Sequence, residues 1–322
     1  MENDKIIIEQ NHTLISHLII IFFSTFIFLG LFHSLFKYSK IEIIVFLTLS
    51  ILIILYLISR EKTIKRKKEI YIGLILSLII SYSIIKIDLK NDIFFQIHLY
   101  YISLVIYHYS EYLSVLIYHF NKCSWHSFLI DQSKEWIFSI LFSFGEYYIE
   151  MIYFKKIKTC LIFIILGLII LIIGQFFRIS ALFTGKISFT HVISYKKKKE
   201  HVLVTNGIYS ISRHPSYFGF FIWSIGTQIL CFNPICIISY IIVLFIFFKD
   251  RILEEEILLI QFFGDEYINY KRKVPILIPF IHLNEDDEKK SLEIYKKNKN
   301  IEEKYPNKIQ NEKNEESFDE EE

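Results

Sequence analysis

Long apolar runs recur along the first 180 residues of this chain, and they restrict its fold more than any other feature. The runs that reach about 18 residues, the length needed to cross a bilayer as a helix, are Leu14–Phe36, Ile41–Ile58, Ile70–Ile87, Ile93–His119, Trp136–Phe154 and Thr159–Phe177. A soluble fold could not surround so many runs of this length with other elements. The sequence therefore predicts an all-α, polytopic integral membrane protein.

A further apolar block, Tyr217–Phe248, is 32 residues long and exceeds the length of one span. Asn233-Pro234 lies at its middle, and this dipeptide is a signal for a turn and for the end of a helix. We therefore expect a C-terminal helical hairpin there, which brings the total to about eight transmembrane helices.

Composition excludes two other classes of protein. Hydrophobic residues make up 53% of the chain, too many for a disordered protein, and its four cysteines form no disulfide framework. The first apolar run follows a mixed-charge head and is too long for the core of a signal peptide, so we expect it to remain as the first span.

Basic residues in the short loops predict the orientation of the chain in the membrane. Segments 60–69 and 178–216 carry six and seven Lys or Arg residues, and cytosolic loops are enriched in these residues. Eight spans with both segments in the cytosol place both termini there too. Lys155, Lys156 and Lys158 go against this rule.

The C-terminal segment differs in composition from the rest. Residues 283–322 hold 14 acidic and 8 basic residues without an apolar period. Such a segment buries too little apolar surface to offset its loss of conformational entropy. We therefore expect a membrane-embedded body, residues 1–282, and a disordered cytosolic tail, residues 283–322. Truncation after Asn284 is expected to leave the body active.

Charged groups near the membrane boundary are default candidates for a functional site. Arg251 and Glu255 lie four residues apart, on one face of the helix that leaves the last span. Arg213-His214-Pro215 places proline where a helix can begin, with free backbone N–H groups nearby. These groups could form a polar site at the mouth of an apolar cavity. Such a site suits a substrate with an apolar tail and an anionic head group.

Other polar residues inside the spans have plainer interpretations. An Arg–Glu pair at this spacing is usually solvated, and Cys231 and Cys236 lack metal-binding partners, so they are interpreted as structural. The histidines of the fourth run are also not spaced for a metal, and no metal site is predicted. Glu111 and Glu146 are stronger candidates, because a carboxylate inside a membrane needs a partner.

Four motifs between residues 177 and 280 resemble the isoprenylcysteine carboxyl methyltransferase family. They are His201-Val-Leu-Val-Thr-Asn-Gly-Ile-Tyr209, Arg213-His-Pro-Ser-Tyr217, Asp250-Arg-Ile-Leu-Glu-Glu-Glu256 and Phe262-Phe-Gly-Asp-Glu-Tyr267. The resemblance implies a multi-pass enzyme of the endoplasmic reticulum membrane with a cytosolic active site. It would transfer a methyl group from S-adenosylmethionine to the C-terminal carboxylate of a prenylated cysteine, without a metal.

The resemblance also implies partners and site residues. The partners would be prenylated CaaX proteins of the small-GTPase type after endoproteolysis, together with membrane lipid and no nucleic acid. Arg251 would bind the substrate, and Arg251 and Glu255 would be the catalytic pair. The donor would be bound by Ser194, His201, Val202, Leu203, Val204, Tyr209, Arg213, His214, Pro215, Ser216, Tyr217 and Glu255. Ser194 stands where the family usually has glutamine, so that contact is altered or lost.

Two alternative functions remain open on the sequence. One is an integral-membrane phospholipid N-methyltransferase, which has a related C-terminal pattern. The other is a transporter that uses Glu111 and Glu146 as intramembrane relays, although no inverted repeat is visible. Sterol reductases also carry a His-Pro-x-Tyr segment, but they use NADPH. The Asp-Arg-x-x-Glu-Glu-Glu run favours methylation of a prenylcysteine.

Overall fold

Within residues 64–87, 94–197 and 201–304, which the computed structural model describes, every regular element is a helix. The longer helices are α4 (Ile64–Lys86), α5 (Phe95–Tyr118), α6 (Lys134–Tyr153), α8 (Leu161–Gly185), α9 (Pro215–Cys231), α10 (Pro234–Phe263) and α12 (Glu285–Lys304). The shorter ones are η1 (Phe120–Lys122), η2 (Trp125–Phe128), α7 (Lys155–Lys158), η3 (Lys186–Ser188), η4 (Gly207–Ser210) and α11 (Asp265–Lys273). The all-α prediction is confirmed for this part of the chain.

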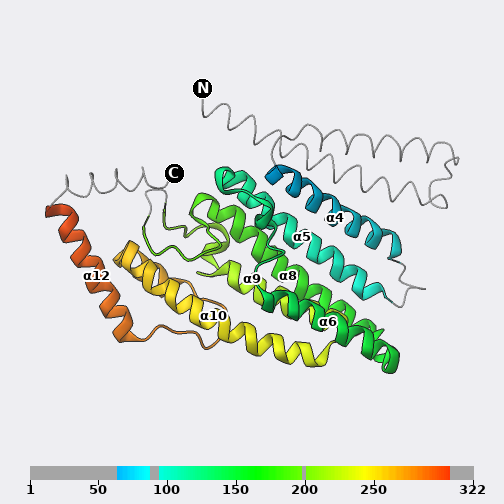
Figure 1. Ribbon diagram of the computed structural model, residues 1–322. Helices are drawn as coiled ribbons and strands as arrows, with labels where there is room; N and C mark the ends of the chain where they lie inside the picture. Colours follow the sequence, from blue (N-terminus) through cyan, green and yellow to red (C-terminus); the bar gives the residue numbers. More distant parts are fainter. Residues whose placement is uncertain (1–63, 88–93, 198–200, 305–322) are drawn as a thin grey trace.

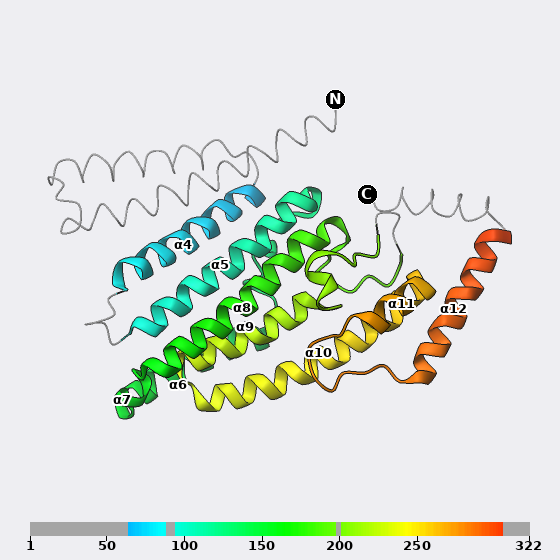
Figure 2. The same cartoon turned by 180° about the vertical axis from the view of Figure 1, so that it is seen from behind.

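The other long helices lie side by side with similar directions, and α12 lies at one end of the bundle, next to α10 (Figures 1 and 2). Each apolar run from Ile70 to Phe177 corresponds to one helix, and the block Tyr217–Phe248 is divided between α9 and α10. The runs Leu14–Phe36 and Ile41–Ile58 lie outside the described residues. Among those described, one stretch, Leu161–Ser188, is long and apolar enough by itself to cross a membrane.

Glycines bring the backbones of α8 and α9 into direct contact. A Cβ added to Gly174 on α8 would lie 2.3 Å from the backbone nitrogen of Trp223 on α9, and one added to Gly226 would lie 2.5 Å from that of Leu171. Small residues at a helix interface permit this approach, which van der Waals contact then stabilises even in lipid. The α8–α9 pair therefore forms the centre of the bundle.

A buried lysine caps the turn between α9 and α10. The Lys158 side chain is 1% exposed, and its Nζ donates to the carbonyls of Cys231 and Phe232 and to Asn233 Oδ1 at 2.8–3.0 Å. It also pairs with Glu150 at 2.7 Å. Because the last carbonyls of a helix have no partner within it, these bonds satisfy the end of α9. Lys158 therefore does not follow the enrichment of basic residues in cytosolic loops, because its side chain is buried and caps the end of α9.

Glu146 has a matching role at the start of α10. Its carboxylate accepts hydrogen bonds from the backbone N–H groups of Ile235 (2.7 Å) and Cys236 (2.8 Å). Free N–H groups and the helix dipole both favour a negative charge at a helix N-terminus. The partner expected for this carboxylate is therefore the hairpin turn, and α6 is tied to α9 and α10 there.

Residues 285–304, which belong to the segment expected to be disordered, form helix α12. Its first turn carries four acidic residues, 285–288, which suit a helix N-terminus. Ser291 is buried, and Leu292 packs against the cluster around Ile260 and Tyr267. Positions 288, 292 and 295, which contact α10 and α11, are three and four residues apart and so share one face, a pattern hidden by the high charge of the segment. Residues 305–322 lie outside the described residues, and the boundary between body and tail stays a prediction.

We predict that Gly174→Ala lowers the thermal stability of the purified protein in detergent. The added Cβ would meet backbone at 2.3 Å, and overpacking of this kind costs about 1–3 kcal/mol. Gly145→Ala on α6 is the matched control, because a Cβ there has no neighbour within 4 Å. It should keep or slightly raise the melting temperature, since alanine favours a helix by about 1 kcal/mol over glycine. Equal melting temperatures for the two variants would contradict the close α8–α9 contact.

Candidate functional site

All twelve residues expected to contact the methyl donor line one cavity. Its lining includes Ser194, His201, Val202, Leu203, Val204, Tyr209, Arg213, His214, Pro215, Ser216, Tyr217 and Glu255. The walls come from the segment that follows α8, the first residues of α9, the second half of α10, and α11. Residues from four separate parts of the chain therefore meet at one end of the bundle. Their roles in binding stay predictions.

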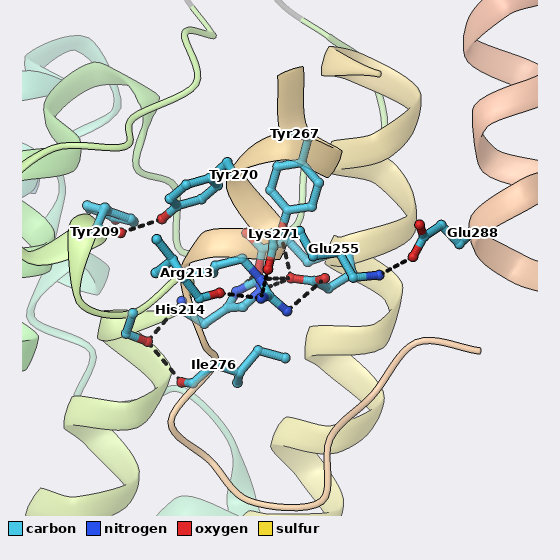
Figure 3. Close-up of polar contacts among 12 residues, drawn as sticks. Tyr209, Arg213, His214, Glu255, Tyr267, Tyr270, Lys271, Ile276 and Glu288 are labelled. Atoms are coloured by element: carbon cyan, nitrogen blue, oxygen red, sulfur yellow. Dashed lines mark hydrogen bonds and ion pairs between the residues drawn. The ribbon is translucent and has the colours of Figure 1, made fainter. Parts of the chain in front are cut away.

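A buried carboxylate, Glu256, organises one side of this cavity. Its Oε1 accepts hydrogen bonds from Arg213 Nε (3.0 Å), His214 Nε2 (2.8 Å) and the Tyr267 hydroxyl, while its Oε2 accepts one from Arg213 Nη2 (3.2 Å). The Arg213 pair is bidentate, which adds strength and geometric specificity. Figure 3 shows Arg213, His214 and Tyr267 close together between α9, α10 and α11. Sequence reasoning missed this role of Glu256, whose only signal was its place in the Glu-Glu-Glu run.

His214 lies between two carboxylates. Its Nε2 contacts Glu256, and its Nδ1 lies 3.6 Å from Glu255 Oε2. Burial opposes a charge on the imidazole, but the interactions with the carboxylates of Glu255 and Glu256 outweigh it and raise the pKa of His214 to about 9. Burial also opposes the charge on Glu256, and the bond to His214 reverses this and lowers its pKa to about 2. At neutral pH an imidazolium is therefore held between two carboxylates.

Glu255 can accept a further hydrogen bond within the cavity. Its Oε2 is buried and has no hydrogen-bond partner among the described residues, although the residue lines the cavity. Aromatic and aliphatic side chains, among them Phe189, Phe262 and Leu203, form other parts of the wall. An acceptor carboxylate beside an apolar wall fits a ligand with hydroxyl or ammonium groups and a flat base, as S-adenosylmethionine has.

The segment that carries Ser194 closes one side of the cavity. Lys197 Nζ donates to the carbonyl of Phe262 (2.6 Å), and the Tyr195 hydroxyl donates to Glu254 (2.6 Å). The Ser194 hydroxyl donates to the carbonyl of Lys196 (2.9 Å), within its own loop. This bond gives a physical reason for the altered contact expected where serine replaces glutamine.

A second buried ion pair lies behind the cavity. Arg178 Nε, near the end of α8, is 2.5 Å from Glu111 Oε1 on α5, and Arg178 Nη1 donates to Ser216 Oγ at 2.5 Å. His191 Nδ1 lies 3.5 Å from the other oxygen of Glu111, and burial lowers the pKa of this imidazole to about 4. Glu111 therefore has its expected partner, a fixed cation. Arg178 was missed, although a charged residue directly after an apolar run is a signal for such a pair.

Arg251 does not line this cavity but is bound to a residue of its wall. Its Nε donates to the Tyr217 hydroxyl (3.0 Å), and its Nη2 donates to the carbonyl of His191 (2.5 Å). Tyr217 lines the first cavity, and His191 lines a second one of about 740 Å³. The two cavities share Phe189 and Ser194 among other residues. Arg251 is therefore bound to one wall residue of each cavity.

Comparison with known proteins agrees with this arrangement. Residues 165–261 match the model of the isoprenylcysteine carboxyl methyltransferase (ICMT) family. Human protein-S-isoprenylcysteine O-methyltransferase is 43% identical over 182 residues, which cover 56% of this chain and 64% of the human protein. The enzyme of that name from Saccharomyces cerevisiae is 41% identical over 194 residues, covering 58% of this chain and 81% of the yeast protein. This chain thus spans less than two thirds of the human relative.

Two further matches extend over nearly the whole of the compared protein. Protein-S-isoprenylcysteine O-methyltransferase B of Arabidopsis thaliana is 40% identical over 190 residues, covering 59% of this chain and 95% of the plant protein. A solved structure of the eukaryotic intramembrane Ras methyltransferase ICMT superposes with a TM-score of 0.73 and 29% identity, over 84% of this chain and 97% of that one. The fold is therefore that of an integral membrane protein. The family resemblance is confirmed, and the chain belongs to the isoprenylcysteine carboxyl methyltransferase family.

Proposed function

We propose that this protein transfers a methyl group from S-adenosylmethionine to the C-terminal carboxylate of a prenylated cysteine and forms a methyl ester. The observation that carries the proposal is the position of Arg251, bound to one wall residue of each of two adjoining cavities. The donor would occupy the first cavity, with Glu255 and the groups around His214. The carboxylate of the substrate would reach the donor from the second cavity.

Methyl transfer to a carboxylate requires little acid–base chemistry. A C-terminal carboxyl group has a pKa of about 3.5 and is already ionised at neutral pH, so no general base is needed. The bound donor supplies a methyl group activated by a sulfonium. The protein must strip water from the carboxylate and orient one of its oxygens toward that methyl carbon.

Arg251 is suited to this orientation. A carboxylate that enters an apolar cavity loses its hydration and needs a fixed cation. Tyr217 and His191 occupy two of the five N–H groups of the guanidinium, as the described residues show. The remaining N–H groups can hold a carboxylate through paired hydrogen bonds. Tyr217, which accepts the bond from Arg251 Nε, connects this position to the donor cavity.

The substrates we propose are prenylated CaaX proteins of the small-GTPase type after endoproteolysis, with the prenyl chain among the membrane helices. A solved relative is described as a Ras methyltransferase, which supports this class.

The site would face the cytosol, where S-adenosylmethionine is supplied, and the protein would cross the endoplasmic reticulum membrane about eight times. Cysteine labels at Lys67 and Lys198 should then react from the cytosolic side of sealed microsomes. Labelling of either from the lumen alone would contradict this orientation.

The direct test of the proposed function is transfer of labelled methyl from S-adenosylmethionine to N-acetyl-S-farnesylcysteine by membranes that contain the protein. Arg251→Ala should lower kcat/KM by about 100-fold or more, equivalent to about 2.7 kcal/mol. Arg251→Lys keeps the charge but not the two-pronged geometry, so its loss should be smaller but still clear. Donor affinity should be unchanged in both variants.

Two results would reject parts of this assignment. Methylation of phosphatidylethanolamine in place of the prenylcysteine would favour the phospholipid N-methyltransferase alternative. Loss of donor binding in Arg251→Ala, with prenylcysteine binding unchanged, would assign Arg251 to the donor.

His214→Ala should weaken donor binding about tenfold without unfolding the protein, because it leaves Glu255 and Glu256 without the cation between them. The exposed His282 provides the matched control, His282→Ala, which should bind the donor normally. Since the pKa of His214 in the folded protein is raised to about 9, the imidazolium persists through neutral pH and is lost as the pH rises through about 9. Equilibrium dialysis against pH should show donor affinity falling in that window, and a flat profile in wild type would contradict the role of His214.

A further inference from the structure

Helix α12 contacts the corner between α10 and α11 through one face. Glu288 forms an ion pair with Lys271 Nζ at 2.6 Å. Leu292 packs against the cluster that includes Tyr267, and the ring of Tyr295 covers Gly264, where an added Cβ would lie 2.2 Å from it. Residues 288, 292 and 295 are spaced i, i+4 and i+7, so they share one face of the helix. The contact therefore extends over two turns.

The surface that α12 covers is the outer side of the donor cavity. The apolar cluster beneath α12 contains Leu203, Leu259, Phe263, Tyr267 and Tyr270. The same five side chains line the cavity. One layer of side chains thus separates α12 from the space assigned to the donor.

A polar path joins α12 to the same site. Lys271 binds Glu288 with its side chain, and its backbone carbonyl accepts a hydrogen bond from Arg213 Nη1 (3.0 Å). Arg213 in turn binds Glu256, the partner of His214. Figure 3 labels Glu288, Lys271, Arg213 and His214 along this path.

Helix α11 needs support from outside itself. It has nine residues, fewer than the roughly 12–15 that an isolated helix needs to be stable in water. It follows Gly264, whose φ of +55° makes a corner that few residues adopt. Its position therefore depends on the groups that bind it, which come from the segment before α9, from α10 and from α12.

We propose that α12 holds the donor cavity in its binding geometry, with Glu288, Leu292 and Tyr295 as positioning residues that act through α11. This inference rests on the proposed function, because it assigns the cavity to the methyl donor. It also reverses the expectation that the chain tolerates truncation after Asn284. The Glu288–Lys271 pair is partly exposed (32% and 17%), so by itself it contributes little. The apolar contacts of Leu292 and Tyr295 carry more of the effect.

The test compares donor affinity among purified full-length and altered proteins in lipid nanodiscs, by equilibrium dialysis with S-adenosylmethionine. Truncation after Asn284 should raise the Kd about tenfold, equivalent to about 1.4 kcal/mol. Glu288→Lys should raise it about threefold, more at low than at high salt, and adding Lys271→Glu should restore it. Glu285→Lys is the matched control, because that side chain is 93% exposed, and it should not change the Kd.

Hydrogen exchange provides a second readout that needs no donor. The amides of residues 265–273 should exchange faster in the truncated protein and in Glu288→Lys than in wild type. A truncated protein with unchanged donor affinity and unchanged exchange would overturn the inference. If the truncated protein fails to fold, the Glu288→Lys variant decides the question. Unchanged donor Kd and unchanged hydrogen exchange in that variant would overturn the inference. Absence of donor binding in the wild type would reject the proposed function instead, and the exchange rates would still decide the role of α12.

Discussion

The direct backbone contact between α8 and α9 is the constraint on which the remaining structure depends. Gly174 and Gly226 leave no side chain between the two helices at those levels, so their relative position has little freedom. The end of α8 and the start of α9 are thereby brought together, and Arg178 reaches Ser216. A wider separation of these helices would remove that contact and move the first turn of α9 away from the cavity.

Buried charges account for the second level of organisation. Inside a membrane protein an isolated charge is costly, so each must find an opposite charge or several hydrogen bonds. Lys158 and Glu146 satisfy the two helix ends at the α9–α10 turn, far along the bundle from the candidate site. At the other end, Arg178 pairs with Glu111, and Glu256 binds two residues that precede α9, Arg213 and His214, and Tyr267 on α11.

These two ends of the bundle serve different purposes. At the α9–α10 turn the buried charges of Lys158 and Glu146 are bound by backbone groups and neighbouring side chains of the described residues, which gives a rigid structure. At the site, Glu255 Oε2 and the remaining N–H groups of Arg251 can still form hydrogen bonds with a ligand. Polar groups that are held in place but incompletely satisfied are expected where a ligand completes them. This contrast distinguishes the candidate site from the other polar cluster more clearly than the number of charges does.

The sequence alone determined the helical class and the position of the α9–α10 turn, because run length and the Asn233-Pro234 signal are local properties. The family resemblance also supplied twelve of the residues that line the cavity. The partners of Glu111 and Lys158, and the organising role of Glu256, were decided by the tertiary structure. Sixty-seven residues separate Glu111 from Arg178, and no local pattern says which helices touch. The docking of α12 was likewise hidden, because a highly charged segment folds here only against a surface built by α10 and α11.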